Sequence, residues 1–396
     1  MQPRRVPPMP SAPTTSRRDA LRALAAGALA LPVSACGTAL GPPFGLPGPL
    51  QSPPIPVGPA PPVSAAPTEP AEVMPVEREA RIRGIEAPRV VTLPPRIPRG
   101  GTIALVAPAG VLRSTGQLDE AVQAVEGLGF RTKVGRNVLN RFGFLAGTDQ
   151  ARARDFMTAV TDPEVDAVLA VRGGWGCARI LPFLDWDAIA ANPKPIVGYS
   201  DITALLLAVY ARTGIATFHG PVGVSTWQGL TSGSFVRTLV EAEPVAVGPE
   251  TRTNRDRTQA VRPGTVTGPV AGGNLSVIAA LAGTGFLPDL ADHVVFFEEV
   301  REDAYRVDRL LVQLELAGVM DEVAGIAFGQ CSNCSSGGSS WSAEETIRRH
   351  LQVSNGPALM GAPIGHVSPV YTMPIGPSAR LDADAGTLEY LGPAVA

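Results

Sequence analysis

The alternation of apolar strand-like runs with helical patterns over residues 100–225 constrains the fold of this chain most strongly. Residues 102–107 and 166–171 are apolar, β-branched runs typical of buried parallel strands. Residues 118–128 and 149–160 between them have helical periodicity. Strands that alternate with helices build a parallel sheet covered on both faces. We therefore predict an α/β fold whose N-terminal domain is a doubly wound parallel sheet of the Rossmann or flavodoxin-like kind.

Within this region, residues 195–207 change abruptly from a strand pattern to a helix pattern. The change falls on Gly198-Tyr199-Ser200-Asp201. A residue at such a turn lies at the carboxyl edge of the sheet and at the amino end of a helix, where ligands bind in open α/β sheets. Ser200 is thus a candidate nucleophile on an elbow, although the motif is not Gly-x-Ser-x-Gly. The alternative is that Ser200 only caps the helix.

The pattern changes after about residue 230, and from Thr265 onward short strands and helices are mixed. We predict a second, mixed α/β domain there, with a cleft between the two domains as the default site. The predicted division is a signal peptide (1–36), a proline-rich tether (37–98), an N-terminal nucleophile domain (99–230), an interdomain linker (231–264) and a C-terminal domain (265–396).

The amino terminus has the pattern of an export signal. Paired arginines at 17–18 precede an apolar run at 23–33 that is too short to span a bilayer, and this arrangement suggests the twin-arginine route. Val33-Ser34-Ala35-Cys36 resembles a lipobox, which predicts a lipidated Cys36; the alternative is an ordinary signal peptide with a chance cysteine. Residues 37–75 hold 13 of the 40 prolines and should form an extended tether.

Composition excludes several classes of partner and cofactor. A formal net charge of −3, with 17% charged residues, leaves no basic footprint for nucleic acid. Cys331 and Cys334 form one Cys-x-x-Cys without a second pair, so we predict no metal site. Outside the cytoplasm these two cysteines could form a disulfide.

A serine nucleophile needs a base, and the chain has 4 histidines. His293 and His350 lie in positions that suggest structural or solvated roles. His219, at a strand end, and His366, in a glycine-containing irregular stretch, are the contenders. Glu298 follows an apolar strand and could orient a histidine, and the alternative for it is a solvated strand end.

A glycine-rich stretch, Arg172-Gly173-Gly174-Trp175-Gly176, follows the predicted strand at 166–171. Glycines let the backbone approach a ligand, so the N–H of this loop could complete an oxyanion hole with that of Asp201. A phosphate-binding loop is the alternative, but the Gly-x-Gly-x-x-Gly spacing and a Lys-Ser/Thr ending are missing.

Taken together, these stretches resemble the LD-carboxypeptidase family, the muramoyltetrapeptide carboxypeptidases. The matching motifs follow the family's order over about three quarters of the chain. They lie at residues 106–110, 144–147, 172–176, 198–205, 219–221, 272–276, 297–300, 305–309 and 365–366.

The resemblance implies a serine carboxypeptidase with a catalytic triad of Ser200, Glu298 and His366. It also implies an oxyanion hole made by the backbone N–H groups of Gly173 and Asp201, a homodimer, and no metal or organic cofactor. The family's substrate is the murein stem tetrapeptide, from which the enzyme removes the terminal D-alanine by cutting an L,D-peptide bond. A substrate carboxylate needs a cation, for which Arg172 and Arg306 are the candidates.

Two departures from the family bear on the prediction. Trp175 stands where tyrosine is usual, and Glu299 where aspartate is common. Well-known members work in the cytoplasm without a signal or tether, whereas we expect this chain to be exported to the periplasm and lipid-anchored through Cys36. Its substrate would then be tetrapeptide stems in, or released from, the wall.

Two other functions stay open. Some family members cleave peptidyl-nucleotide antibiotics in self-immunity, for which Trp175 or Trp227 could stack on a base. A chain without catalytic activity, which binds the wall as a lipoprotein, is the third possibility.

Overall fold

The computed structural model describes residues 84–86, 90–248 and 258–396, which belong to one compact unit within Val76–Ala396. The predicted signal peptide, Cys36 and most of the predicted tether lie outside the described residues. No helix in the described ranges is both long enough and apolar enough to cross a bilayer.

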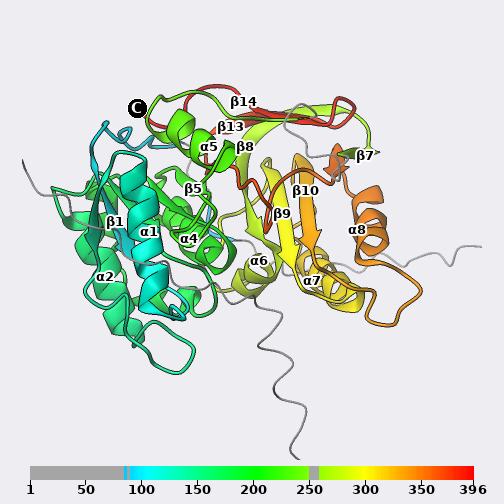
Figure 1. Ribbon diagram of the computed structural model, residues 1–396. Helices are drawn as coiled ribbons and strands as arrows, with labels where there is room; N and C mark the ends of the chain where they lie inside the picture. Colours follow the sequence, from blue (N-terminus) through cyan, green and yellow to red (C-terminus); the bar gives the residue numbers. More distant parts are fainter. Residues whose placement is uncertain (1–83, 87–89, 249–257) are drawn as a thin grey trace, which may run out of the picture. The chain divides into compact units, whose positions relative to one another are not determined.

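The first sheet has six strands in the order β12-β5-β4-β3-β1-β2 (Figure 1). All neighbouring pairs are parallel except β12 with β5. The parallel strands thus follow the order 2-1-3-4-5 of flavodoxin-like folds, which confirms the predicted fold class. The strands are β1 (Thr102–Val106), β2 (Arg131–Val134), β3 (Ala167–Ala170), β4 (Ile196–Gly198), β5 (Thr217–His219) and β12 (Met373–Ile375).

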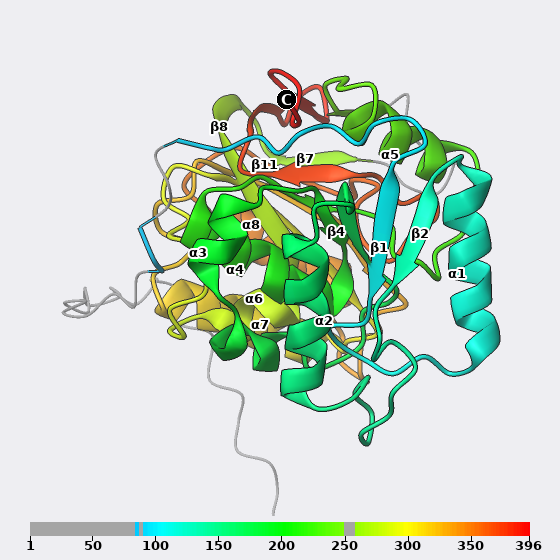
Figure 2. The same cartoon turned by 90° about the vertical axis from the view of Figure 1, so that its left-hand side faces the viewer.

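Helices cover both faces of this sheet because alternate strand residues point to opposite sides. Ala104 and Val106 of β1 join the apolar core with α2 (Asp149–Thr161) and α4 (Thr203–Thr213). Ile103 and Leu105 join a second core with α1 (Thr115–Gly127) and α5 (Leu230–Leu239). Figure 2 shows α2 and α4 on one side of β1 and β2 and α1 on the other. The short helices η1 (Cys177–Phe183) and α3 (Trp186–Ala191) lie between β3 and β4 in the chain.

The second sheet has eight strands in the order β6-β14-β13-β8-β9-β10-β11-β7. Its central strands β8 to β11 are parallel, and the outer ones pair antiparallel. The strands are β6 (Ala246–Val247), β7 (Gln259–Arg262), β8 (Thr265–Asn274), β9 (Val294–Val300), β10 (Gly325–Ser332), β11 (Ala358–Met360), β13 (Ser378–Asp382) and β14 (Thr387–Tyr390).

One apolar core joins the two sheets. It continues from Leu206 of α4 to Ile278 of α6 (Leu275–Leu281), Leu311 of α7 (Ala304–Leu316) and Ile347 of α8 (Ala343–Gln352). Figure 1 shows α6 between α4 and α7. Helix α6 contributes to both sides of this core and so fixes the position of the two sheets relative to each other. The polar residues at the strand ends of the two sheets are therefore also fixed relative to each other.

Two features differ from the expected division of the chain. The segment 231–264, predicted as a linker, holds most of α5 as well as β6 and β7, and Phe235 and Leu239 of α5 are buried in the core. Near the end of the chain, β12 crosses back to pair with β5 of the first sheet. The return of this strand ties the C-terminal part of the chain to the N-terminal sheet.

Candidate active site

The carboxyl ends of the central strands of both sheets meet at a pocket of about 550 Å³. Parallel strands carry their functional residues at this end. Ser200 follows β4, Val300 and Arg301 end and follow β9, Asn333 follows β10, and His366 lies in the segment after β11. The full lining is Arg172, Gly174, Tyr199, Ser200, Val224, Ser225, Thr226, Thr231, Val300, Arg301, Asn333, His366, Val367, Ser368 and Val370.

Ser200 occupies a strained turn between β4 and α4. Its φ is 64°, in the left-handed region that non-glycine residues avoid, and it begins the short 3-10 turn η2 (Ser200–Ile202). The hydroxyl makes no helix-capping bond, because the residue before α4 is Ile202. A backbone of this kind presents the serine side chain at the sheet edge, as in a nucleophile elbow. The geometry therefore does not fit the alternative of a simple helix cap.

Glu298 and His366 form a hydrogen-bonded pair. Glu298 is fully buried within β9, not after it, and its Oε2 accepts a bond of 2.7 Å from His366 Nδ1, whose side chain is 20% exposed. Glu298 is therefore not the solvated strand end of the alternative reading. A carboxylate on Nδ1 fixes the tautomer that leaves Nε2 unprotonated and able to accept a proton. No hydrogen bond joins the Ser200 hydroxyl to His366, although both side chains line the pocket.

Gly365 and Tyr199 set the position of the His366 ring. Gly365 has a φ of +117°, and a Cβ built on it would lie 2.6 Å from Glu298 Cβ, so only glycine lets this loop approach the carboxylate so closely. The Tyr199 ring packs edge-on against the His366 ring with centroids 4.9 Å apart. The imidazole is thus held by the carboxylate on one nitrogen and by an aromatic ring on its side.

The glycine loop after β3 lies directly against Ser200. A Cβ built on Gly173 would be 2.8 Å from Ser200 Cβ and 3.0 Å from its Oγ. Two hydrogen bonds hold the loop in place. Asp201 Oδ2 accepts one from Cys177 N at 2.8 Å, and the buried Arg152 donates the other to the Gly176 carbonyl at 2.8 Å. The Gly173 backbone therefore approaches the Ser200 side chain more closely than any residue with a side chain could.

His219, the other histidine contender, lies behind the pocket. Its side chain is buried, both ring nitrogens are without a partner among the described residues, and it packs edge-on against Tyr199 and Phe296. Burial lowers the pKa of His219 to about 4, so the ring is neutral.

The other two histidines have structural partners: His293 bonds Tyr210, and His350 bonds Glu315 and Asp308.

The predicted substrate-binding residues are placed differently from one another. Arg172 lines the pocket, and its guanidinium donates to the Val111 carbonyl at 2.7 Å. Arg306 pairs with Glu302 and is not among the lining residues. Trp175 is 73% exposed and also outside the lining. Trp227 donates to the Val222 and Gly223 carbonyls and packs on Phe235.

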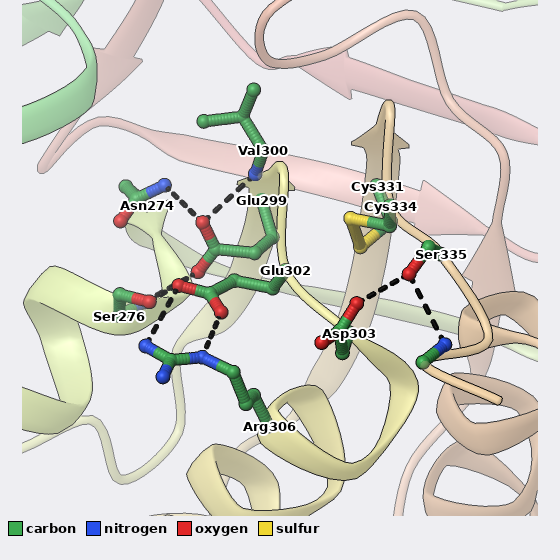
Figure 3. A network of polar contacts seen from close by, with 11 residues as sticks. Asn274, Ser276, Glu299, Val300, Glu302, Asp303, Arg306, Cys331, Cys334 and Ser335 are labelled. Atoms are coloured by element: carbon green, nitrogen blue, oxygen red, sulfur yellow. Dashed lines mark hydrogen bonds and ion pairs between the residues drawn. A yellow bond between two sulfur atoms is a disulfide. The ribbon is translucent and has the colours of Figure 1, made fainter. Parts of the chain in front are cut away.

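Arg301 and Asn333, at the ends of β9 and β10, are among the lining residues that sequence reasoning missed. Asn333 lies inside the disulfide that joins Cys331 to Cys334. Figure 3 shows this bridge beside the buried Glu299, which accepts bonds from Asn274, Ser276 and Val300. The only sequence signals for Arg301 and Asn333 were their places next to Glu298-Glu299 and between two cysteines.

Asp201 provides a pH-dependent test of this architecture. Burial raises the pKa of its carboxyl from 3.8 to about 6. Because the folded-state pKa lies above the unfolded one, the stability that this group contributes is complete below about pH 4 and is lost as pH rises through 6. Asp201→Asn keeps an oxygen for Cys177 N–H and removes the titration. We expect the free energy of unfolding of the variant, relative to the wild type, to increase between pH 4 and pH 8 by up to about 3 kcal/mol.

Urea unfolding at several pH values measures this difference. Asp187→Asn, at an exposed position of α3, is the control and should show no such trend. A difference between Asp201→Asn and the wild type that stays constant with pH would mean that the carboxyl does not titrate in this range.

Both halves of the described chain match domains of a known family. Residues 103–220 match the LD-carboxypeptidase N-terminal domain and residues 267–381 match the LD-carboxypeptidase C-terminal domain. A probable murein peptide carboxypeptidase of Bacillus subtilis is 35% identical over 296 residues, covering 73% of this chain and 91% of that protein. A murein tetrapeptide carboxypeptidase of Pseudomonas aeruginosa is 32% identical, covering 72% and 95%.

A self-immunity protein is also similar. The microcin C7 self-immunity protein MccF of Escherichia coli is 30% identical over 291 residues, covering 66% of this chain and 84% of that protein. The solved structure of MccF in complex with glutamyl sulfamoyl guanosine superposes with a TM-score of 0.71 at 27% identity, covering 77% of this chain and 99% of that one. Since both domain matches and the two-sheet fold agree, the chain belongs to the LD-carboxypeptidase family and is a peptidase hydrolase.

Proposed function

We propose that this protein is a serine carboxypeptidase that hydrolyses the L,D-peptide bond to the terminal D-alanine of murein tetrapeptides. The observation that carries the proposal is one pocket holding a serine with left-handed backbone and a histidine bonded to a buried carboxylate. Relatives named murein peptide and murein tetrapeptide carboxypeptidase support the substrate class.

In the first half of the reaction, His366 Nε2 takes the proton of the Ser200 hydroxyl as its oxygen bonds to the carbonyl carbon of the third residue. Glu298 stabilises the imidazolium that forms. The oxyanion accepts hydrogen bonds from the backbone N–H groups of Gly173 and Asp201. His366 then gives its proton to the nitrogen of D-alanine, the C–N bond breaks, and D-alanine leaves.

In the second half, water repeats the same chemistry. His366 deprotonates a water molecule that attacks the acyl-serine, and the proton returns to the Ser200 oxygen as the tripeptide leaves. The hydrogen bond between Ser200 and His366 would form when substrate closes the site, as catalytic hydrogen bonds often tighten only in the complex. We assign the terminal carboxylate to Arg172, which lines the pocket and was a candidate for this role from the sequence.

Incubating the full chain with a disaccharide tetrapeptide tests the proposal. Mass spectrometry should find the corresponding tripeptide together with free D-alanine. The control peptide ends in L-alanine, which presents an L,L-bond, and should be cleaved far more slowly. Lack of D-alanine release between pH 5 and 8, or equal release from both peptides, would contradict the proposed specificity.

A second candidate is hydrolysis of a peptidyl nucleotide, favoured by the likeness to MccF. Of the two tryptophans considered, Trp227 is occupied in packing and hydrogen bonding, which leaves the exposed Trp175 to stack on a base. Trp175 lies outside the pocket lining, which makes this candidate the weaker one. The intact Glu298–His366 pair beside Ser200 argues against a wall-binding protein without catalytic activity.

We further propose that the protein is exported to the periplasm, is anchored through a lipid on Cys36, acts in wall turnover, and forms a homodimer. These proposals rest on the twin arginines, the lipobox-like residues 33–36 and the family resemblance. Labelling of cells with a lipid precursor should mark the wild type and not Cys36→Ala; equal labelling of the two would exclude the anchor.

A further inference from the structure

The backbone is unusual at three places around the same pocket. Five non-glycine residues of the described ranges have a positive φ: Ser200, Ala242, Asp292, Arg301 and Asn333. Three of them, Ser200, Arg301 and Asn333, line the pocket. Such a conformation is unfavourable for serine and arginine and less so for asparagine, and it persists at functional sites where the surroundings hold it. The proposed reaction explains Ser200 and leaves Arg301 and Asn333 without a role.

The surroundings hold both residues firmly. The bridge between Cys331 and Cys334 closes the turn that contains Asn333. Arg301 N donates to the Ser332 carbonyl at 2.9 Å, which ties the two turns together. The residues next to these turns in the chain are hydrogen-bonded as well: Val300 N donates to Glu299, and the Ser335 hydroxyl donates to Asp303 (Figure 3). Arg301 and Asn333 therefore lie on turns at the edge of the sheet that are fixed by a backbone hydrogen bond and a disulfide.

Arg301 is the cation of this edge that is not already paired. Arg306 is bound to Glu302, and Arg309 lies over the ring of Tyr305. Among the residues that the structure describes, the Arg301 side chain has neither an acidic partner nor a hydrogen bond. Arg172 also lacks an acidic partner there, and neither aspartate nor glutamate lines the pocket. The pocket thus presents two arginines and the Asn333 amide to a ligand.

We propose that Arg301, together with Asn333, binds a second carboxylate of the substrate, on the acyl side of the scissile bond, and so determines specificity. This inference rests on the proposed function, in which Arg172 binds the terminal carboxylate. Arginine and an amide are suited to a carboxylate because both donate hydrogen bonds. In a stem tetrapeptide this carboxylate has two sources: the α-carboxylate of the γ-linked D-glutamate, and the side-chain carboxylate of a third residue that is a diamino diacid.

Three tetrapeptides distinguish these sources: one with both carboxylates free, one amidated on the glutamate, and one amidated on the third residue. For the wild type we expect one of the two amidations to lower kcat/KM about 10-fold or more. For Arg301→Gln we expect a loss of roughly 10- to 100-fold on the unmodified peptide, mainly in KM, and no further loss from that amidation. The amidation that lowers kcat/KM for the wild type but not for Arg301→Gln identifies the carboxylate that Arg301 binds.

Two further variants separate recognition from folding. Arg301→Gly removes the side chain at a position whose backbone suits glycine, so it should fold as well as the wild type and lose the same discrimination. Arg96→Gln, at an exposed arginine outside the pocket, should behave as the wild type. An equal loss on all three peptides, or no loss on any, from Arg301→Gln would overturn the proposal.

Calorimetry keeps this test separate from the proposed reaction. The three peptides are titrated into Ser200→Ala with and without Arg301→Gln, which measures binding without turnover. Weaker binding of only those peptides that keep the recognised carboxylate supports the role of Arg301, even for a protein that releases no D-alanine. Unchanged affinity for all three peptides contradicts that role, whereas missing D-alanine release contradicts only the proposed function.

Discussion

Ser200→Ala is expected to lower kcat for D-alanine release by roughly 10⁴- to 10⁶-fold, the range found when the nucleophile of a serine hydrolase is removed. The reason is that the Ser200 hydroxyl oxygen forms the covalent bond, and alanine has no atom that can replace it. KM should change little, because the arginines and the glycine loop to which we assign substrate contacts stay in place. Release of D-alanine under saturating tetrapeptide measures kcat.

The variant should fold normally. Alanine adopts a φ of 64° about as poorly as serine does, and it keeps the Cβ that packs against Gly173. Ser232→Ala, on α5 and outside the pocket, is the matched control and should keep the wild-type rate. Turnover by Ser200→Ala within 10-fold of the wild type, with an unchanged unfolding midpoint, would remove Ser200 from its proposed role.

The sequence predicts β1, β3, β4 and β5 of the first sheet because each lies in an apolar run that alternates with a helical pattern, whereas β2 (Arg131–Val134) is polar and largely exposed and carries no such signal. Leu169 of β3 and Phe156 of α2 belong to patterns whose burial follows directly from their periodicity. The turn at Ser200 is also predictable, since Gly198 and the polar residues after it interrupt two apolar segments. The same reasoning located Glu298 and His366 as candidates at a strand end and at a glycine turn.

The environment of these residues could not be predicted from their neighbours in the chain. Glu298 was expected at the rim of a sheet, but β9 continues to Val300 between β8 and β10, and Glu298 is fully buried. Its bond to His366 joins residues 68 positions apart, which no local pattern reveals. The pairing of β12 with β5 is of the same kind, because three apolar residues give no sign of which sheet they will join.

The roles of arginines depend on partners that the sequence does not show. Arg172 and Arg306 were equivalent candidates until the structure placed Glu302 against Arg306. Arg301 was missed because its left-handed backbone and its place in the pocket depend on contacts between β9 and the turn after β10. The side chains that reach the pocket from strands far apart in the sequence are thus the part of the site that the sequence alone does not predict.

Glu298→Gln is expected to lower kcat by about 10²- to 10⁴-fold with a much smaller effect on KM. The amide cannot balance the positive charge on His366, and its NH₂ can turn to Nδ1 and favour the tautomer that has its proton on Nε2. The Ser200 proton then has no acceptor. Because Glu298 Oε1 is buried without a partner among the described residues, loss of the charge should not lower the free energy of unfolding, and can raise it.

Glu315→Gln is the matched control for this prediction. Glu315 Oε1 bonds His350 Nδ1 at 2.6 Å, so the variant changes the same kind of pair outside the pocket. It should leave kcat at the wild-type value.

Steady-state kinetics on the tetrapeptide and urea unfolding of both variants measure the two effects separately. A Glu298→Gln enzyme with wild-type kcat would mean that His366 needs no carboxylate, whereas equal losses in both variants would show a general effect of losing a Glu–His pair. Because only Glu298 lies behind a histidine of the pocket, a loss confined to Glu298→Gln ties the buried carboxylate to the reaction at Ser200.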